Sequence, residues 1–346
     1  MAKPKILFIK TGGTICQKPN DQGVLEPSPE DYLQTVNGLE NLAQVDVVDV
    51  GLLDSTDMGT SERAKMAETI FDVRKEYDGF VVAHGTDTMV ETAAALTYML
   101  KGFRKPIVLT GSQKPAWVGG SDAQNNVYYA VQTATRDIGE TVICFGDFVL
   151  RGTRAKKVDE EGWNAFNTPG LAPLGKRTSL EAGIALEDHR IKRGDNSRDA
   201  SLFTGFETGI FNYDHTSGSS VVGALESVVD NPEIKGILMG GFGAGNIPTN
   251  LLPLIRRATS QGKPVAVYTK CLKGAADMAV YAVGSAALDA GAIPAGDMTP
   301  EALGQKLMYA LGLAEGSIDF SKRIEFVKKI ISHPIGKDIT VTELRK

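Results

Sequence analysis

The sequence predicts an α/β protein, with a larger N-terminal domain built on a doubly wound, mainly parallel sheet and a smaller C-terminal α/β domain. Apolar runs of strand length alternate with segments of helical spacing, the pattern of a parallel sheet covered on both faces. The 346 residues exceed the usual size of one domain. Charge rises and periodicity fades over residues 183–198. We therefore assign residues 1–190 to the N-terminal domain, 191–204 to a linker and 205–346 to the C-terminal domain.

The predicted strands of the N-terminal domain are short apolar runs, at residues 5–10, 45–51, 79–83, 107–110 and 141–145. Helices are expected over residues 62–75 and 89–100, the first capped by Ser61 and facing the core with Ala67, Ile70 and Phe71. Residues 150–157 read as a basic loop. In the C-terminal domain we expect strands at 207–211, 236–239 and 265–268, with a helix at 251–259.

Hydroxyl and acidic side chains follow several of these strands. Thr11-Gly12-Gly13-Thr14-Ile15 comes after the first strand, and His84-Gly85-Thr86-Asp87-Thr88 after the strand at 79–83. The carboxyl ends of parallel strands share one edge, where open α/β sheets bind ligands. The side chains expected to reach one cleft there are Thr14, Ser55, Thr56, Thr86, Asp87 and Ser112.

A threonine that attacks a substrate needs a base and a polarised electrophile, because a hydroxyl is a poor nucleophile at neutral pH. Lys157 is a candidate base, since burial in a cleft lowers the pKa of a lysine; the alternative is an exposed surface lysine. Asp87 is placed to accept hydrogen bonds from an ammonium group, or to cap the following helix.

The other candidates in these motifs have structural interpretations. Gly12 and Gly13 permit a tight turn or close approach to a ligand, but they also fit an ordinary strand-to-helix turn. The dinucleotide pattern G-x-G-x-x-G is absent after the first strand. His84 is expected to be a hydrogen-bonded core or turn histidine, and Cys16 a small buried apolar residue.

Composition excludes several classes of function. The net charge of −5 comes without a basic cluster, which argues against nucleic-acid or membrane partners. Three widely spaced cysteines argue against a disulfide framework, and four histidines show no ligand spacing, so we expect no metal and no cofactor. With neither a leader pattern nor a membrane-length apolar window, we expect a cytoplasmic protein.

Five ordered motifs make the chain resemble the bacterial-type L-asparaginase family. They are TGGTI from residue 11, DSTDM at 54–58, HGTDTM at 84–89, LTGSQ at 109–113 and LRGxRxxK ending at Lys157. Later segments around Gly243, Cys271 and Ala295 resemble the cytoplasmic, type I branch in particular.

The resemblance implies L-asparagine as substrate, hydrolysed to L-aspartate and ammonia through an acyl-threonine intermediate. Thr14 matches the attacking threonine, Thr86 and Lys157 match a proton relay, and Asp87 matches the anchor of the substrate α-ammonium. Ser55 and Thr56 match residues that bind the α-carboxylate, and Ser112 matches a position near the amide. Which threonine attacks first is open from sequence, and we favour Thr14.

The family also implies an assembly of subunits. Its cleft is completed by the C-terminal domain of a neighbouring subunit, which implies a homodimer or a tetramer built from dimers. Asp277 falls roughly where that neighbour contributes a polar contact.

One position departs from the family pattern. A tyrosine usually follows the first motif on a mobile loop, but Val24 stands in its place here and has no hydroxyl. Glu26 and Tyr32 are nearby candidates to replace it. This departure leaves open a sensor that binds an amino acid and hydrolyses it slowly. A glutaminase-asparaginase is also open, because asparagine and glutamine differ by only one methylene. A third alternative is the asparaginase-like subunit of an aminoacyl-tRNA amidotransferase.

Overall fold

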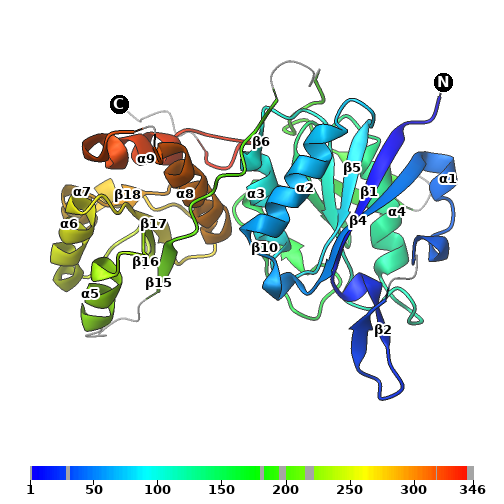
Figure 1. Cartoon of the computed structure of the whole chain (residues 1–346), viewed down its shortest axis with the longest axis horizontal. Helices are drawn as coiled ribbons and strands as arrows, with labels where there is room; N and C mark the ends of the chain where they lie inside the picture. The colour runs from blue at the N-terminus through cyan, green and yellow to red at the C-terminus, as the bar shows by residue number, and fades with distance from the viewer. Residues whose placement is uncertain are drawn as a thin grey trace. The chain divides into compact units, whose positions relative to one another are not determined.

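The computed structural model describes residues 2–28, 32–179, 183–194, 200–214, 222–316 and 318–340. The chain divides into two compact units, Met1–Thr204 and Gly205–Lys346. Both units combine helices with a largely parallel sheet, which confirms the predicted fold class (Figure 1).

An eight-stranded sheet forms the centre of the N-terminal unit. In spatial order its strands are β13 (Gly183–Leu186), β12 (Gly175–Ser179), β9 (Phe148–Arg151), β8 (Thr141–Phe145), β7 (Ile107–Thr110), β5 (Gly79–Ala83), β1 (Lys5–Gly12) and β4 (Gln44–Leu53). The five strands from β8 to β4 are parallel, whereas β9, β12 and β13 each pair antiparallel with their neighbours. The chain runs from β1 to β4 on one side and then to β5 on the other. The strand order therefore reverses at β1, which is where open sheets form ligand crevices.

Helices cover both faces of this sheet (Figure 1). They are α1 (Leu39–Leu42), α2 (Thr60–Asp72), α3 (Met89–Met99) and α4 (Ala123–Ala134). All five residues of β5 are buried, so side chains on both faces of that strand pack against covering elements. On the α4 face, Phe8 and Val81 share one apolar core with Val127. This packing fixes the strand ends on which the candidate site is built.

The short elements of the unit connect or extend this framework. They are η1 (Thr14–Cys16), β2 (Gln17–Pro19), β3 (Leu25–Pro27), η2 (Tyr32–Thr35), η3 (Ser55–Asp57), β6 (Leu100–Lys101), η4 (Gly152–Arg154), β10 (Lys156–Lys157), β11 (Phe166–Asn167) and β14 (Ser201–Leu202). Strands β2 and β3 form a hairpin that projects from the unit (Figure 1).

The predicted N-cap of the first helix, Ser61, was wrong. Helix α2 has Gly59 and not Ser61 at its N-cap, because the Glu62 carboxylate turns back to accept the Gly59 N–H at 3.1 Å. Part of the segment in which periodicity fades, Gly183–Leu186, is strand β13, which pairs antiparallel with β12. Strand β14, further along, pairs with β6 in the same unit.

The C-terminal unit has a four-stranded parallel sheet in the order β15 (Ile210–Tyr213), β16 (Gly236–Gly241), β17 (Val265–Thr269) and β18 (Ile293–Pro294). Its further elements are α5 (Val222–Asp230), η5 (Thr249–Leu251), α6 (Leu252–Ser260), η6 (Met278–Val280), α7 (Ala282–Asp289), α8 (Pro300–Ala314), η7 (Phe320–Lys322) and α9 (Arg323–Ser332). Within α8, Lys306 is fully buried and pairs with Asp338 at 2.8 Å. No helix in the described ranges combines the length and apolarity needed to cross a bilayer.

Candidate active site

The two glycine turns of the N-terminal unit touch through their backbones. Gly13 has φ of 82°, and a Cβ placed on it would lie 2.5 Å from the Gly85 Cα. A Cβ on Gly85 would in turn lie 2.6 Å from the Ser55 Oγ. The ends of β1, β4 and β5 therefore pack so closely that only glycine fits between them. This contact brings the segments that carry Thr14, Ser55 and Thr86 to one place.

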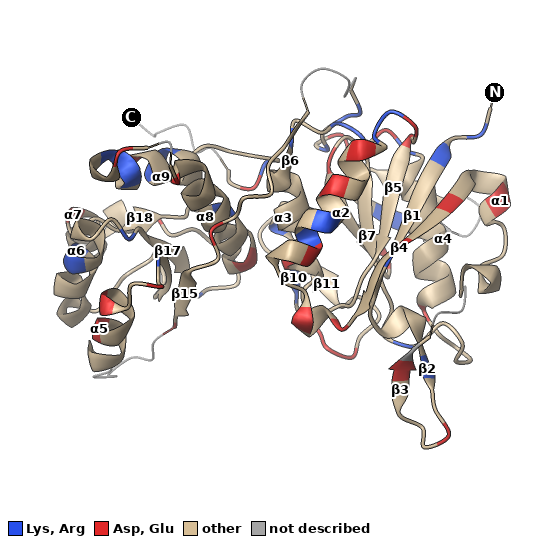
Figure 2. Cartoon of the chain, in the orientation of Figure 1, with Lys and Arg blue, Asp and Glu red and all other residues tan. Residues whose placement is uncertain are grey.

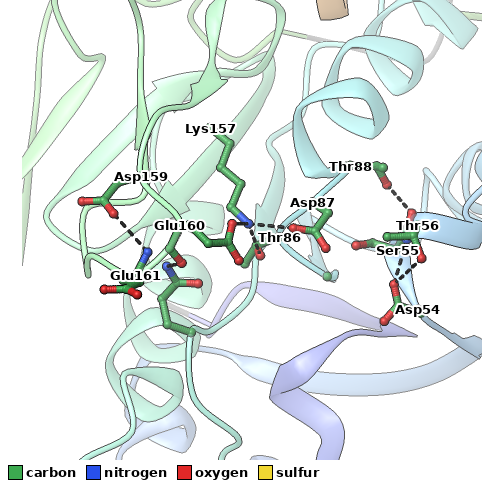
Figure 3. Close-up of polar contacts among 12 residues, drawn as sticks. Asp54, Ser55, Thr56, Thr86, Asp87, Thr88, Lys157, Asp159, Glu160 and Glu161 are labelled. Carbon is green, nitrogen blue, oxygen red and sulfur yellow. Dashed lines mark hydrogen bonds and ion pairs between the residues drawn. The ribbon is translucent and has the colours of Figure 1, made fainter.

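Lys157 joins a second part of the chain to this place. Its Nζ donates to the Thr86 Oγ1 at 3.0 Å and to the Asp87 Oδ1 at 2.7 Å (Figure 3). The lysine lies in β10, which pairs with β11, and its side chain is 14% exposed. Lys157 thus lies beside Thr86 and Asp87, although it follows them by about seventy residues in sequence.

The charge state of Lys157 differs from the expectation of a lowered pKa. Burial favours the neutral amine, but hydrogen bonds and charge attraction from Asp87 and Glu160 outweigh it and raise the pKa of Lys157. Glu160 lies 2.6 Å from the Nζ. Lys157 is therefore an ammonium in this structure, and it acts as a hydrogen-bond donor toward Thr86.

Asp87 does not cap the following helix. The N-cap residue of α3 is Thr88, whose hydroxyl donates to the Ser55 carbonyl at 2.7 Å. The Asp87 side chain is instead turned to Lys157 and is 49% exposed. The carboxylate is therefore accessible to an ammonium group of a ligand.

Ser55 and Thr56 begin the short helix that follows β4. Ser55 is buried, whereas Thr56 is exposed and donates from its hydroxyl to Asp54 at 2.8 Å (Figure 3). The same carboxylate accepts the Thr56 backbone N–H, and this bond lowers the pKa of Asp54. Asp54 therefore fixes the position of the Thr56 hydroxyl.

A buried polar chain supports the second glycine turn from behind. The His84 Nδ1 lies 2.7 Å from the Gly85 carbonyl, and its Nε2 lies 2.9 Å from the Thr92 hydroxyl. The Arg63 Nε donates to the same hydroxyl at 3.0 Å. The carbonyl can only accept, so Nδ1 carries the proton. His84 is therefore a hydrogen-bonded core histidine, as predicted, and burial lowers its pKa to about 4.

Two other predicted residues have local partners. The Ser112 hydroxyl, buried after β7, donates to the Lys114 carbonyl at 2.6 Å. Cys16 is buried and donates from Sγ to the Gly13 carbonyl, and burial raises the pKa of its thiol to about 11. Cys16 is thus a small buried residue, as predicted, and an unreactive thiol.

Val24 lies at the turn of the β2–β3 hairpin and is 54% exposed. The Glu26 carboxylate accepts a hydrogen bond from the Asn20 side chain at 2.8 Å within the hairpin. Tyr32 is fully buried in the core, edge-on to Phe8. Of the two candidate replacements for the missing tyrosine, only Glu26 is carried by the hairpin.

Sequence reasoning missed Glu160 and Gln113. Gln113 donates from its side chain to the Glu160 carbonyl at 2.7 Å and to the Gly162 carbonyl at 3.1 Å. The acidic run Asp159-Glu160-Glu161, starting two residues after Lys157, was the available signal. It could have indicated a counter-ion three residues beyond the lysine.

Asp277 belongs to the C-terminal unit, where it is exposed at the N-cap position of η6.

Within the described ranges, no group of three or more His, Cys, Asp or Glu side chains could hold a metal ion. Basic and acidic positions are interspersed along both units (Figure 2).

The domain described as "Asparaginase, N-terminal" matches residues 5–190, and the "Glutaminase/Asparaginase C-terminal domain" matches residues 220–321. The chain belongs to the asparaginase family. An L-asparaginase from Thermococcus kodakarensis is 34% identical over 343 residues, which cover 97% of this chain and 99% of that protein.

The chain is similar to proteins of two kinds. The crystal structure of L-asparaginase I from Vibrio cholerae superposes with a TM-score of 0.86 at 29% identity, covering 98% of this chain and 100% of that one. One of the subunits of a glutamyl-tRNA(Gln) amidotransferase from Saccharolobus islandicus is 33% identical over 90% of this chain but only 72% of its own length. These two asparaginases thus match along more of both chains than the amidotransferase subunit does.

Proposed function

We propose that this protein is an amidohydrolase that converts L-asparagine to L-aspartate and ammonia through an acyl-threonine intermediate. The observation that supports the proposal is the backbone contact of Gly13, the residue before Thr14, with Gly85, the residue before Thr86, whose hydroxyl accepts a hydrogen bond from Lys157. Full-length similarity to an L-asparaginase supports the choice of substrate.

In the first half of the reaction, the Thr14 Oγ attacks the side-chain amide carbon of asparagine. The C–N bond breaks, the nitrogen leaves as ammonia after gaining a proton, and an ester to Thr14 remains. Water then attacks the ester carbon, which releases aspartate and restores the hydroxyl. Thr86 and Lys157 relay protons in both halves, and Thr86 activates the water.

The substrate is held by its α-groups. Asp87 is half-exposed and anionic, so we assign it to the α-ammonium. Ser55 and Thr56 lie at the adjoining strand end and bind the α-carboxylate, with Asp54 fixing the Thr56 hydroxyl. Ser112 lies near the amide.

Ammonia release from L-asparagine and L-glutamine by the purified protein tests this proposal, with Thr14→Ala and Thr86→Ala measured in parallel. We expect release from asparagine, and its loss in both variants with the circular dichroism spectrum unchanged. Near-normal turnover in either variant removes that threonine from the mechanism. A difference of one methylene is worth only about 1–3 kcal/mol in a pocket, so we also expect some glutamine turnover.

Val24 favours a second candidate, an amino-acid-binding protein with slow hydrolysis. Valine cannot polarise Thr14 or carry its proton. Aspartate binding measured by calorimetry, together with no turnover of either amide, supports this candidate against the first.

We also infer a homodimer or a tetramer of dimers, in which Asp277 contributes to the neighbouring cleft. Large apolar side chains near Asp277 are exposed, as an interface requires; they are Leu272, Val280, Tyr281 and Val283. Light scattering during size-exclusion chromatography tests this assembly.

The three cysteines are free, which supports a reducing, cytoplasmic location.

A further inference from the structure

The Lys157 ammonium is fully engaged. An ammonium has three N–H bonds, and three acceptors surround this one (Figure 3). They are the Thr86 Oγ1 at 3.0 Å, the Asp87 Oδ1 at 2.7 Å and the Glu160 Oε2 at 2.6 Å. Two acceptors are anions, and the third is the hydroxyl whose proton Lys157 is proposed to take. Lys157 therefore has no lone pair to offer until it loses a proton.

Glu160 lies in a hydrogen-bonded loop beside Lys157, although its own side chain is 79% exposed. The Asp159 carboxylate accepts the backbone N–H groups of Glu161 and Gly162, both at 3.0 Å. Gln113 holds the Glu160 carbonyl from another part of the chain. These bonds set the backbone position from which Glu160 reaches the ammonium.

The two anions have different roles in the proposed reaction. Asp87 is assigned to the substrate α-ammonium, so its charge is shared once substrate binds. Glu160 has no such assignment. On the other side of Lys157, strand β11 contributes the uncharged Phe166 and Asn167. Among the described residues, Glu160 is thus the counter-ion that remains dedicated to Lys157.

We propose that Glu160 is a positioning residue that holds Lys157 as an ammonium beside Thr86 and thereby sets the pH above which Lys157 accepts the Thr86 proton. The inference rests on the proposed function of Thr86 and Lys157. The proton balance is simple. Lys157 first releases one N–H proton to water, and the neutral amine then takes the Oγ proton of Thr86. The negative charge of Glu160 opposes the first step, so it displaces activity toward alkaline pH.

Glu160→Gln is the decisive variant, because it removes the charge and keeps the size and an acceptor oxygen. Glu161→Gln is the matched control, since it is the same change one residue away, and in the described part of the chain Lys157 bonds to Glu160 and not to Glu161. We expect the acid limb of the kcat/KM profile to move down by about half a pH unit in Glu160→Gln, as for an exposed ion pair. At each pH on that limb the variant is then about three times faster than the wild type.

Structural damage lowers the rate at every pH, so a gain in rate at low pH is specific to the proposal. An acid limb that stays within about 0.2 unit of the wild type in Glu160→Gln, or that moves equally in Glu161→Gln, overturns it.

A second readout separates this inference from the proposed function. The pH dependence of labelling of Lys157 by a limiting amine-reactive reagent, quantified by peptide mass spectrometry, measures the titration of its amine without turnover. We expect the same downward shift in Glu160→Gln and none in Glu161→Gln. With this shift but no ammonia release from either amide, the proposed function fails and the coupling of Glu160 to Lys157 stands. Without the shift, the inference fails whatever the activity.

Discussion

Replacing His84 by glutamine tests whether the turn that carries Thr86 is built on a buried neutral imidazole. His84 is fully buried, and its pKa falls from the ordinary 6.5 to about 4. At a pH between these two values, the His84 imidazole is protonated in the unfolded chain and neutral in the folded chain. The free energy of unfolding therefore falls as the pH is lowered through this window.

The size of the effect follows from the two pKa values. One pKa unit corresponds to about 1.4 kcal/mol. Protonation of His84 on unfolding therefore lowers the free energy of unfolding by about 2 kcal/mol between pH 7 and pH 5. Glutamine cannot titrate. His84→Gln lowers stability at pH 7 by removing the bond to the Gly85 carbonyl, but it also abolishes this part of the pH dependence. Every carboxylate titrates in both proteins, so their contributions cancel in the comparison.

Urea unfolding at pH 7 and pH 5, followed by tryptophan fluorescence, measures the difference. Trp117 and Trp163, the two tryptophans of the chain, lie in the same unit as His84, so the signal reports the relevant unit. His189→Gln, an exposed histidine of that unit, is the control and is expected to follow the wild type. Equal losses in the wild type and in His84→Gln would refute a neutral buried imidazole at this position.

Three further predictions concern the turns, the hairpin and the C-terminal unit. In Gly13→Ala, the added Cβ would lie 2.5 Å from Gly85 backbone atoms, so we expect a loss of about 1–3 kcal/mol in urea unfolding and ammonia release reduced by more than tenfold; retained turnover contradicts the close approach. Val24→Tyr is expected to raise ammonia release by supplying a hydroxyl, and an unchanged rate means that another group already fills that role. Lys306→Met removes the buried ammonium that pairs with the buried Asp338 carboxylate, so we expect a cost of about 3–5 kcal/mol in unfolding followed by circular dichroism; a cost below about 1 kcal/mol argues that the pair is not buried in solution.

The arrangement of the strand ends could be predicted from sequence because it follows from local pattern. Continuous apolar runs at β1, β5 and β7 identify buried parallel strands, and parallel strands end on one edge. Hydroxyl residues directly after such runs are therefore neighbours in space. The backbone contact of Gly13 with Gly85 brings the two turns closer together than the spacing of the strands alone requires.

The ionisation of Lys157 could not be predicted in the same way. A lysine in a cleft has a lowered pKa only when burial outweighs its counter-ions. Asp87 precedes Lys157 by seventy residues, and Glu160 follows it by three. Whether both carboxylates reach one ammonium depends on the β10–β11 pairing and on the Gln113 bonds to the following loop. These are tertiary contacts without a periodic signal.

Substrate binding and activation of the relay are linked through Asp87. The same carboxylate that is proposed to receive the substrate α-ammonium accepts a hydrogen bond from Lys157. A second cation at Asp87 weakens its hold on Lys157 and repels the ammonium directly, so both effects favour the neutral amine that Thr86 requires. Glu160 acts in the opposite direction, because it is not assigned to the substrate and keeps its full charge when the substrate binds. The occupied site is then the state in which Lys157 loses its proton most easily, and an amide that lacks the α-ammonium is expected to leave Lys157 protonated and the relay inactive.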